Sequence, residues 1–270
     1  MLEIINHTLF KKDHTYARMV DRYLPETGAG VNIYSDHQRQ LIQQLRPQVK
    51  KEFFFTITDV RTGKIIYSEG VDKWLGFASS HFNQKTYLGC LHPGHAVVQN
   101  FFSLSLFDLL IGKEITAGHH SPVCTGTIAL KNSKGSFLYC KKTSYPFFIT
   151  NESYVGEYLS EYIIIKGYAG EDYSMVLNDD KVSYNERIYK RARHRFEENS
   201  GFSTQELRII KRYAYSKDPT SEQIAQAFKI QKGTVDKFNK RILKKTELLY
   251  KMSFANAKDT ALYFRKTGLI

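Results

Sequence analysis

One stretch of the chain, residues 202–245, limits the possible folds more than any other: FSTQELRIIKRYAYSKDPTSEQIAQAFKIQKGTVDKFNKRILKK. It holds two capping boxes, Ser203 with Glu206 and Thr220 with Gln223. In such a pair each side chain bonds a backbone N–H that the first turn of a helix leaves unpaired. The first box predicts a helix from residue 204, and the second predicts a new helix just after Pro219, which cannot continue the one before it.

A third helix is predicted over about residues 232–246, after a turn at residues 229–233 in which Gly233 tolerates dihedrals that other residues resist. Val235, Phe238 and Ile242 recur on one face of this helix at helical spacing. Its opposite face carries four cations: Lys237, Lys240, Arg241 and Lys244. An apolar face that docks onto two helices and a cationic face left free indicate a helix-turn-helix with a recognition helix.

The charge of the chain is concentrated in the same region. The formal net charge is +12, and residues 184–270 hold about 20 Lys and Arg against about 9 Asp and Glu. The first 183 residues are therefore close to neutral. Lysines on a helix are usually just a solvated face, but a cationic third with this motif favours binding to phosphate.

These residues resemble the LuxR/GerE-type helix-turn-helix of bacterial transcription regulators, over about the last 70 residues. The resemblance lies in the segments FSTQE, SEQIAQAFKI and KGTVDKFNKRILKK. It implies that the third helix enters the major groove and that a fourth helix mediates dimer contacts. The chain departs from the family pattern at Gln231, where a Ser or Thr cap is usual, at Asp236, where a basic residue is common, and at Phe238, where His is usual. The loop between the first two helices is also longer.

The resemblance and the exposed face together predict which residues contact DNA. Asp236, Lys237 and Lys240 are expected at base edges, where an acidic residue can accept a hydrogen bond from cytosine N4. Thr234, Arg241 and Lys244 are expected to hold phosphates. Thr220 and Ser221, at the start of the second helix, are expected to do the same.

The first two thirds of the chain predict an α+β fold. A helix is expected at 13–24 and another at 35–49, separated by the turn 25–30. The period then changes to two strands (53–60 and 65–68), a short helix (71–77), a long apolar helix (96–110) and three later strands (123–130, 136–149 and 154–167).

That element order, with the segments FFFTITDVRTGKIIY, VDKWLGF and LHPGH, resembles a PAS sensor domain. The expected organisation is an N-terminal helical extension (1–50), a PAS-like antiparallel sheet with helices (51–172), a basic helical linker (173–200) and an all-α four-helix helix-turn-helix domain (201–270). The basic helix at 184–199 is either a rigid lever between the two domains or a solvated connector.

PAS domains bind flavin, haem or small metabolites, or simply dimerise, and each ligand requires different residues. Cys90 lacks the polar neighbours of a photoactive flavin site and is expected to be structural. His92 and His95 flank Pro93 and Gly94, which favours a helix start over a metal or haem site. No cofactor and no metal is therefore predicted, while an apolar pocket for an unknown small molecule stays open.

Several classes are excluded or disfavoured by composition. The chain has no stretch of 18 apolar residues, so no membrane span is predicted. The N-terminus does not resemble a secretion signal. Three cysteines without paired spacing are typical of a reduced cytoplasmic protein. The chain lacks a phosphate-binding Gly-rich loop and a catalytic constellation, so no enzyme activity is expected. The leading interpretation is a one-component, sequence-specific regulator that binds double-stranded DNA as a homodimer. A helix is expected at 255–267 with Ala257, Thr260, Ala261 and Phe264 on one face; this face either contacts a second copy, as the resemblance implies, or packs against the first helix of the same domain. The alternatives are a PAS-containing interaction adaptor that does not bind DNA specifically and a module that contacts RNA polymerase.

Overall fold

A computed structural model of the chain describes residues 36–49, 53–60, 62–112, 114–115, 118, 121–149, 155–178, 183–217 and 219–270. The helix predicted at 13–24, the turn at 25–30 and the turn after residue 149 lie outside these residues. None of the helices in the described ranges is both long enough and apolar enough to cross a membrane.

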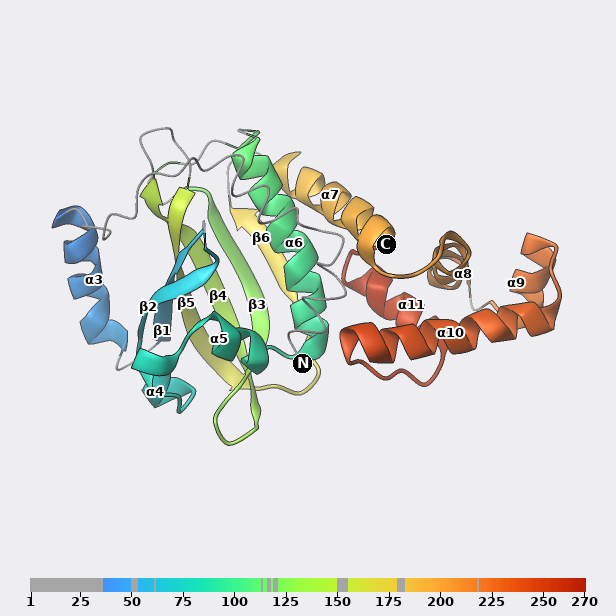
Figure 1. The fold of residues 1–270 in the computed structure, drawn as a ribbon, viewed down its shortest axis with the longest axis horizontal. Coiled ribbons are helices and arrows are strands. Elements are labelled where there is room, and N and C mark those ends of the chain that lie inside the picture. The colour runs from blue at the N-terminus through green and yellow to red at the C-terminus, as the bar shows by residue number, and fades with distance from the viewer. Residues whose placement is uncertain are drawn as a thin grey trace.

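The fold is α+β, as predicted, and the described residues form an antiparallel sheet in the order β2-β1-β5-β4-β3-β6 (Figure 1). The strands are β1 (Phe53–Asp59), β2 (Lys64–Glu69), β3 (Val123–Lys131), β4 (Phe137–Ile149), β5 (Val155–Gly167) and β6 (Ser174–Asn178). The first five match the predicted strands. β6 was not predicted: it falls in the segment expected to be a helical linker, and it pairs with β3 along the edge of the sheet.

The two faces of the sheet are covered by different helices because successive side chains of a strand point to opposite faces. Phe53 and Phe55 of β1 pack with α3 (Asp36–Val49) on one face. Phe54 packs on the other face, with α4 (Val71–Trp74) and α5 (Gln84–Cys90). The long helix α6 (Pro93–Ile111) begins at the predicted His-Pro step, with Pro93 in its first turn, and also covers this second face (Figure 1).

The basic helix α7 (Ser183–Asn199) packs against α6 along its length. Ile188, Ala192 and Phe196 are buried, and Arg195 forms an ion pair with Asp108 of α6 at a position where both are largely buried. This helix is therefore not merely a solvated connector, because its apolar face is part of the core. Its role as a rigid lever stays a prediction.

Four further helices follow: α8 (Thr204–Tyr215), α9 (Ser221–Phe228), α10 (Lys232–Tyr250) and α11 (Ala257–Lys266). They extend to one side of the sheet, beyond α6 and α7 (Figure 1). One continuous apolar core runs from α6 through α7 into these helices. Gly268 ends α11 in the left-handed conformation, φ 76°, as its position predicted.

The face of α11 expected to contact a second copy is used inside the chain. Ala257, Thr260, Ala261 and Phe264 are all buried, and α11 packs on α8. The prediction that this face mediates dimer contacts is wrong for the arrangement seen here, because the small residues allow α11 to approach its own domain closely.

Candidate nucleic-acid interface

Both capping boxes form as predicted and fix where α8 and α9 begin. Ser203 Oγ accepts from the Glu206 backbone N–H at 3.3 Å, and Glu206 Oε2 accepts from the Ser203 N–H at 2.7 Å. The second box has the same geometry, with Thr220 Oγ1 accepting from the Gln223 N–H at 3.3 Å and Gln223 Oε1 accepting from the Thr220 N–H at 2.9 Å.

The turn between α9 and α10 differs from the sequence prediction. The residue in the left-handed region is Lys229, φ 54°, which ends α9. Gly233 instead lies inside the first turn of α10, without a positive φ. The chain therefore reverses before Gly233, and Lys229 carries the backbone strain. Gln231 makes no side-chain capping bond, as its departure from the family pattern indicated.

The inner face of α10 is held by both apolar and polar contacts. Val235 and Ile242 are fully buried. Asn239, which the sequence reasoning did not single out, donates from Nδ2 to the Tyr213 hydroxyl at 2.9 Å and to Ser221 Oγ at 3.3 Å. An Asn in the middle of an apolar face breaks the pattern, and that break was the available signal for its role. These contacts fix the rotation of α10 relative to α8 and α9.

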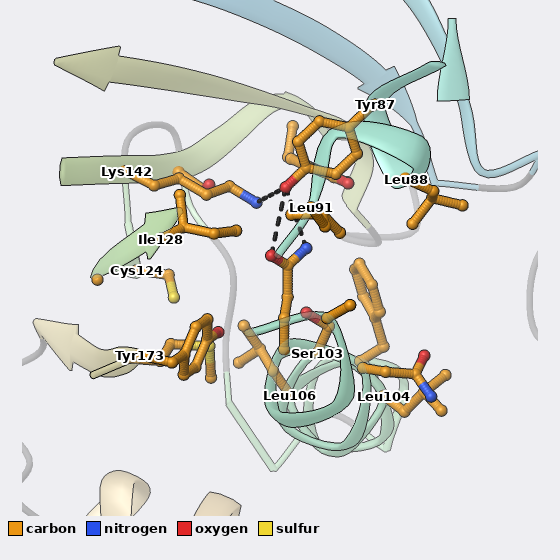
Figure 2. Close-up of a pocket in the computed structure, with 18 of the residues that line it drawn as sticks. Tyr87, Leu88, Leu91, Ser103, Leu104, Leu106, Cys124, Ile128, Lys142 and Tyr173 are labelled. Atoms are coloured by element: carbon orange, nitrogen blue, oxygen red, sulfur yellow. Dashed lines mark hydrogen bonds between the residues drawn. The ribbon is translucent and has the colours of Figure 1, made fainter. Parts of the chain in front are cut away.

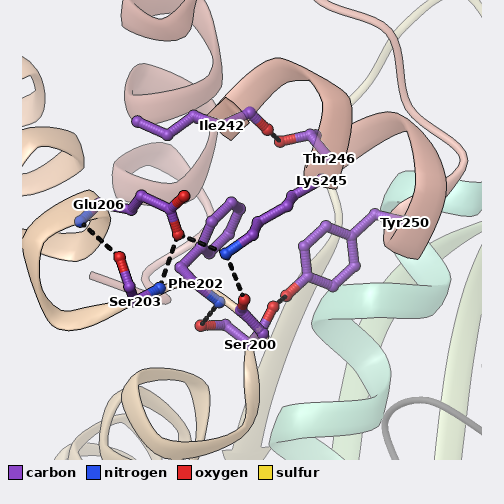
Figure 3. Close-up of polar contacts among 9 residues, drawn as sticks. Ser200, Phe202, Ser203, Glu206, Ile242, Lys245, Thr246 and Tyr250 are labelled. Atoms are coloured by element: carbon purple, nitrogen blue, oxygen red, sulfur yellow. Dashed lines mark hydrogen bonds and ion pairs between the residues drawn. The ribbon is translucent and has the colours of Figure 1, made fainter. Parts of the chain in front are cut away.

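An ion pair between half-buried Lys245 and buried Glu206 ties α10 to the start of α8 (Figure 3). Lys245 Nζ lies 2.5 Å from Glu206 Oε2 and donates to the Gly201 carbonyl at 2.9 Å. One turn further on, the Tyr250 hydroxyl donates to the Ser200 carbonyl at 2.6 Å. Burial alone would raise the pKa of Glu206, but the hydrogen bonds from Lys245 and from the Ser203 N–H outweigh it and lower that pKa. The Lys245 ammonium is therefore engaged within the domain and does not belong to the outward cationic face.

The outward face of α10 presents the four predicted cations without acidic partners. Lys237, Lys240, Arg241 and Lys244 are exposed, and no ion pair joins any of them to a carboxylate of the described residues. Arg241 lies over the Phe238 ring, 5.8 Å from its centroid. By contrast, Lys232 at the start of the helix is paired with Glu222.

The other predicted contact residues lie on or near the same side. Thr234 and Asp236 are half-buried in the first turns of α10, and Thr220 is exposed at the start of α9. The Thr220 hydroxyl already serves the capping box, and Ser221 Oγ is used by Asn239. A phosphate at α9 would therefore meet chiefly backbone N–H groups, since the two side-chain hydroxyls are engaged.

His95 and Cys90, two of the residues weighed as candidates for other sites, are buried in the fold. His95 uses both ring nitrogens: Nδ1 accepts from the Ala129 N–H at 2.9 Å, and Nε2 lies 2.9 Å from the Glu171 carbonyl oxygen. Burial lowers the pKa of His95 to about 4, so the ring is neutral near pH 7. Cys90 is buried, and burial raises the pKa of its thiol to about 11, which leaves it unreactive.

Comparison with known proteins gives only distant likenesses. No sequence profile of a protein family matches the chain, and no curated protein matches it in sequence. Among solved structures, the chain is similar to phage VqmA in complex with DPO, at 13% identity and TM-score 0.31, over 86% of this chain and 88% of that one. It is similar to the Vibrio cholerae VqmA dimer, a LuxR-type receptor, at 10% identity and TM-score 0.29, over 87% of this chain and 89% of that one. It is also similar to Escherichia coli SdiA, at 13% identity and TM-score 0.28, over 94% of this chain and 98% of that one.

Proposed function

We propose that this protein is a sequence-specific transcription regulator that binds double-stranded DNA in the cytoplasm and has no enzyme activity. One observation carries the proposal: α10 is fixed by a buried face, while Lys237, Lys240, Arg241 and Lys244 project outward with no carboxylate partner among the described residues. An exposed row of uncompensated cations on a rigid helix suits a polyanionic duplex, and an α-helix fits the major groove.

The proposed contacts divide into two kinds. Asp236, Lys237 and Lys240 lie at i, i+1 and i+4 in the first half of α10 and read base edges. Thr234, Arg241 and Lys244 hold phosphates, together with the start of α9 at Thr220 and Ser221, where free N–H groups and the helix dipole favour an anion. Base contacts set sequence preference, whereas phosphate contacts set affinity and salt dependence.

A homodimer remains part of this proposal. One helix-turn-helix contacts a single half-site, and two copies multiply specificity by reading two half-sites about one helical turn apart. Because the small-residue face of α11 is buried in its own chain, the contacts between copies must come from other surfaces. Light scattering of the full chain, with and without duplex DNA, measures the number of copies.

The test begins with selection of bound duplexes from a random pool by the full-length chain. On the selected duplex, Lys244→Ala should weaken binding to all sequences alike and reduce the slope of log K against log salt by about 1. Lys237→Ala should instead change the sequence preference, by about 1–3 kcal/mol at the contacted base pair. Lys134→Ala, which removes an exposed cation from the β3–β4 hairpin, is the matched control and should change neither.

Two outcomes would refute the proposal. If the chain ignores duplex DNA even in dilute buffer, the cationic face has another partner, and a protein-interaction adaptor or an RNA polymerase contact takes precedence. If Lys237→Ala leaves both affinity and preference unchanged, α10 does not read the groove.

A further inference from the structure

A cavity of about 520 Å³ lies between the sheet and the helices α5 and α6. Most of its lining is apolar, with Leu88 and Leu91 from the α5 region, Leu104 and Leu106 from α6 and Ile128 from β3 (Figure 2). A volume of this order suits a small organic molecule. The apolar lining alone does not indicate which polar group such a molecule carries.

One charged side chain enters this cavity from the sheet. Lys142 of β4 lies opposite Tyr162 of β5 in the strand register, and its amino group points toward the Tyr87 hydroxyl (Figure 2). The Lys142 Nζ atom is 3.5 Å from Tyr87 Oη. It also lies 5.7 Å from the Tyr87 ring centroid and 5.6 Å from that of Tyr162.

The Lys142 ammonium has no counter-charge from the described part of the chain. An ammonium has three donors, and the long bond to Tyr87 Oη is the one acceptor that the described residues offer it. No Asp or Glu is among the described residues that line the cavity, whereas a second cation, Lys251 at the end of α10, borders it. A buried ammonium without a carboxylate is costly to the fold.

Two aromatic neighbours nevertheless favour the charged form of this lysine. Burial favours the neutral amine, whereas the faces of the Tyr87 and Tyr162 rings and the Tyr87 hydroxyl oxygen stabilise the ammonium. A lysine that keeps its proton is a poor nucleophile toward a carbonyl group and a good partner for an anion. Next to it, Gln99 Nε2 lies 3.1 Å from Tyr87 Oη, so Lys142, Tyr87 and Gln99 form one polar cluster in a cavity whose lining is mostly apolar.

From this arrangement we propose that the cavity binds a small amphipathic acid, whose carboxylate pairs with Lys142 and Tyr87 while its hydrocarbon part fills the space along α6. The ligand supplies the negative charge that the described lining lacks. This inference goes beyond DNA binding and does not depend on it, since the cavity lies in the sheet domain and the outward face of α10 is not part of it.

The test uses the full chain without DNA and calorimetric titration with two matched series. One series is the straight-chain carboxylates from butanoate to dodecanoate, with 3-phenylpropanoate added; the other is the corresponding primary amides, which are of similar shape but uncharged. The best acid should bind at least about tenfold more tightly than its amide, the amount that a charge-assisted hydrogen bond contributes. If no acid binds more tightly than its amide, the proposal is wrong.

Substitutions at Lys142 and Lys141 distinguish loss of the ligand's ionic partner from damage to the fold. Lys142→Met should weaken the best acid at least about tenfold and change the affinity of its amide less than about threefold. Lys141→Met, an exposed neighbour on the same strand, should change neither. Without ligand, Lys142→Met should also raise the melting temperature, because it removes an uncompensated buried charge. Retention of acid binding by Lys142→Met, or a lower melting temperature without ligand, would overturn the proposal by showing that the protein itself already satisfies the ammonium.

Discussion

Replacing Lys245 by Met tests how α10 is held in place. Lys245 bonds Glu206 Oε2 and the Gly201 carbonyl, while Glu206 also belongs to the capping box of α8. Removing the ammonium leaves the Glu206 carboxylate with the Ser203 N–H as its remaining bond in the cluster of Figure 3. Met retains the length and most of the apolar contact of the Lys side chain, so the change isolates the charge.

The burial of the two partners sets the expected magnitude. The Glu206 side chain is 3% exposed and that of Lys245 is 34% exposed. Breaking a fully buried pair from one side costs about 3–5 kcal/mol, whereas an exposed pair contributes about 0–1 kcal/mol. Because the carboxylate left behind is the buried partner, we expect a loss of about 2–3 kcal/mol. For a chain of this size that corresponds to a melting temperature lower by about 4–12 °C.

Thermal unfolding followed by circular dichroism measures this loss, with Lys244→Met as the matched control. Lys244 is the neighbouring residue and is exposed, so its replacement should change the melting temperature by little. The pKa of Glu206 is lowered in the fold, so its contribution is present above the unfolded carboxyl pKa and is lost as pH falls through the folded value. The deficit of Lys245→Met should therefore shrink below about pH 4. Equal melting temperatures for the two variants at pH 7 would refute the assignment of Lys245 as the clamp of α10.

Two other substitutions test the packing of the chain. The pKa of His95 in the folded chain is about 4, below its unfolded value. Protonation of the unfolded chain therefore lowers stability as pH falls from about 6.5 toward 4. In urea unfolding at several pH values, His95→Gln should flatten this dependence of stability on pH by up to about 1.4 kcal/mol per pH unit. A wild-type stability that does not fall in this window would contradict it. Gly268→Ala adds a Cβ at φ 76° that would lie 2.8 Å from the Tyr189 ring, whereas Gly135→Ala at φ 89° meets nothing within 4 Å. Both substitutions should destabilise the fold by about 1 kcal/mol, because a residue with a Cβ is strained at positive φ. Thermal unfolding should show a larger loss for Gly268→Ala because of the added contact with Tyr189. Equal losses would mean that the end of α11 does not pack on α7 as seen here.

Local rules in the sequence determined the helices of the C-terminal part. Ser203, Glu206, Thr220 and Gln223 form capping boxes whose partners are three residues apart, so no long-range information is needed to place the starts of α8 and α9. The spacing of Val235 and Ile242 likewise shows which side of α10 faces inward, because a helical period is read directly from the chain. The positions of the first five strands along the chain follow from the same kind of local pattern, whereas their order in the sheet does not.

Only the tertiary structure decided what depends on partners far away in the chain. β6 is a short edge strand with little pattern of its own, and it exists because β3 offers it backbone partners. The small face of α11 suits any close helix, and the structure shows that α8 of the same chain occupies it. Lys142 and Lys245 are both lysines in polar stretches of sequence, yet one faces a cavity without a described carboxylate and the other faces Glu206. The amino-acid type determines the charge of a side chain, whereas the fold determines its partner and its exposure to solvent.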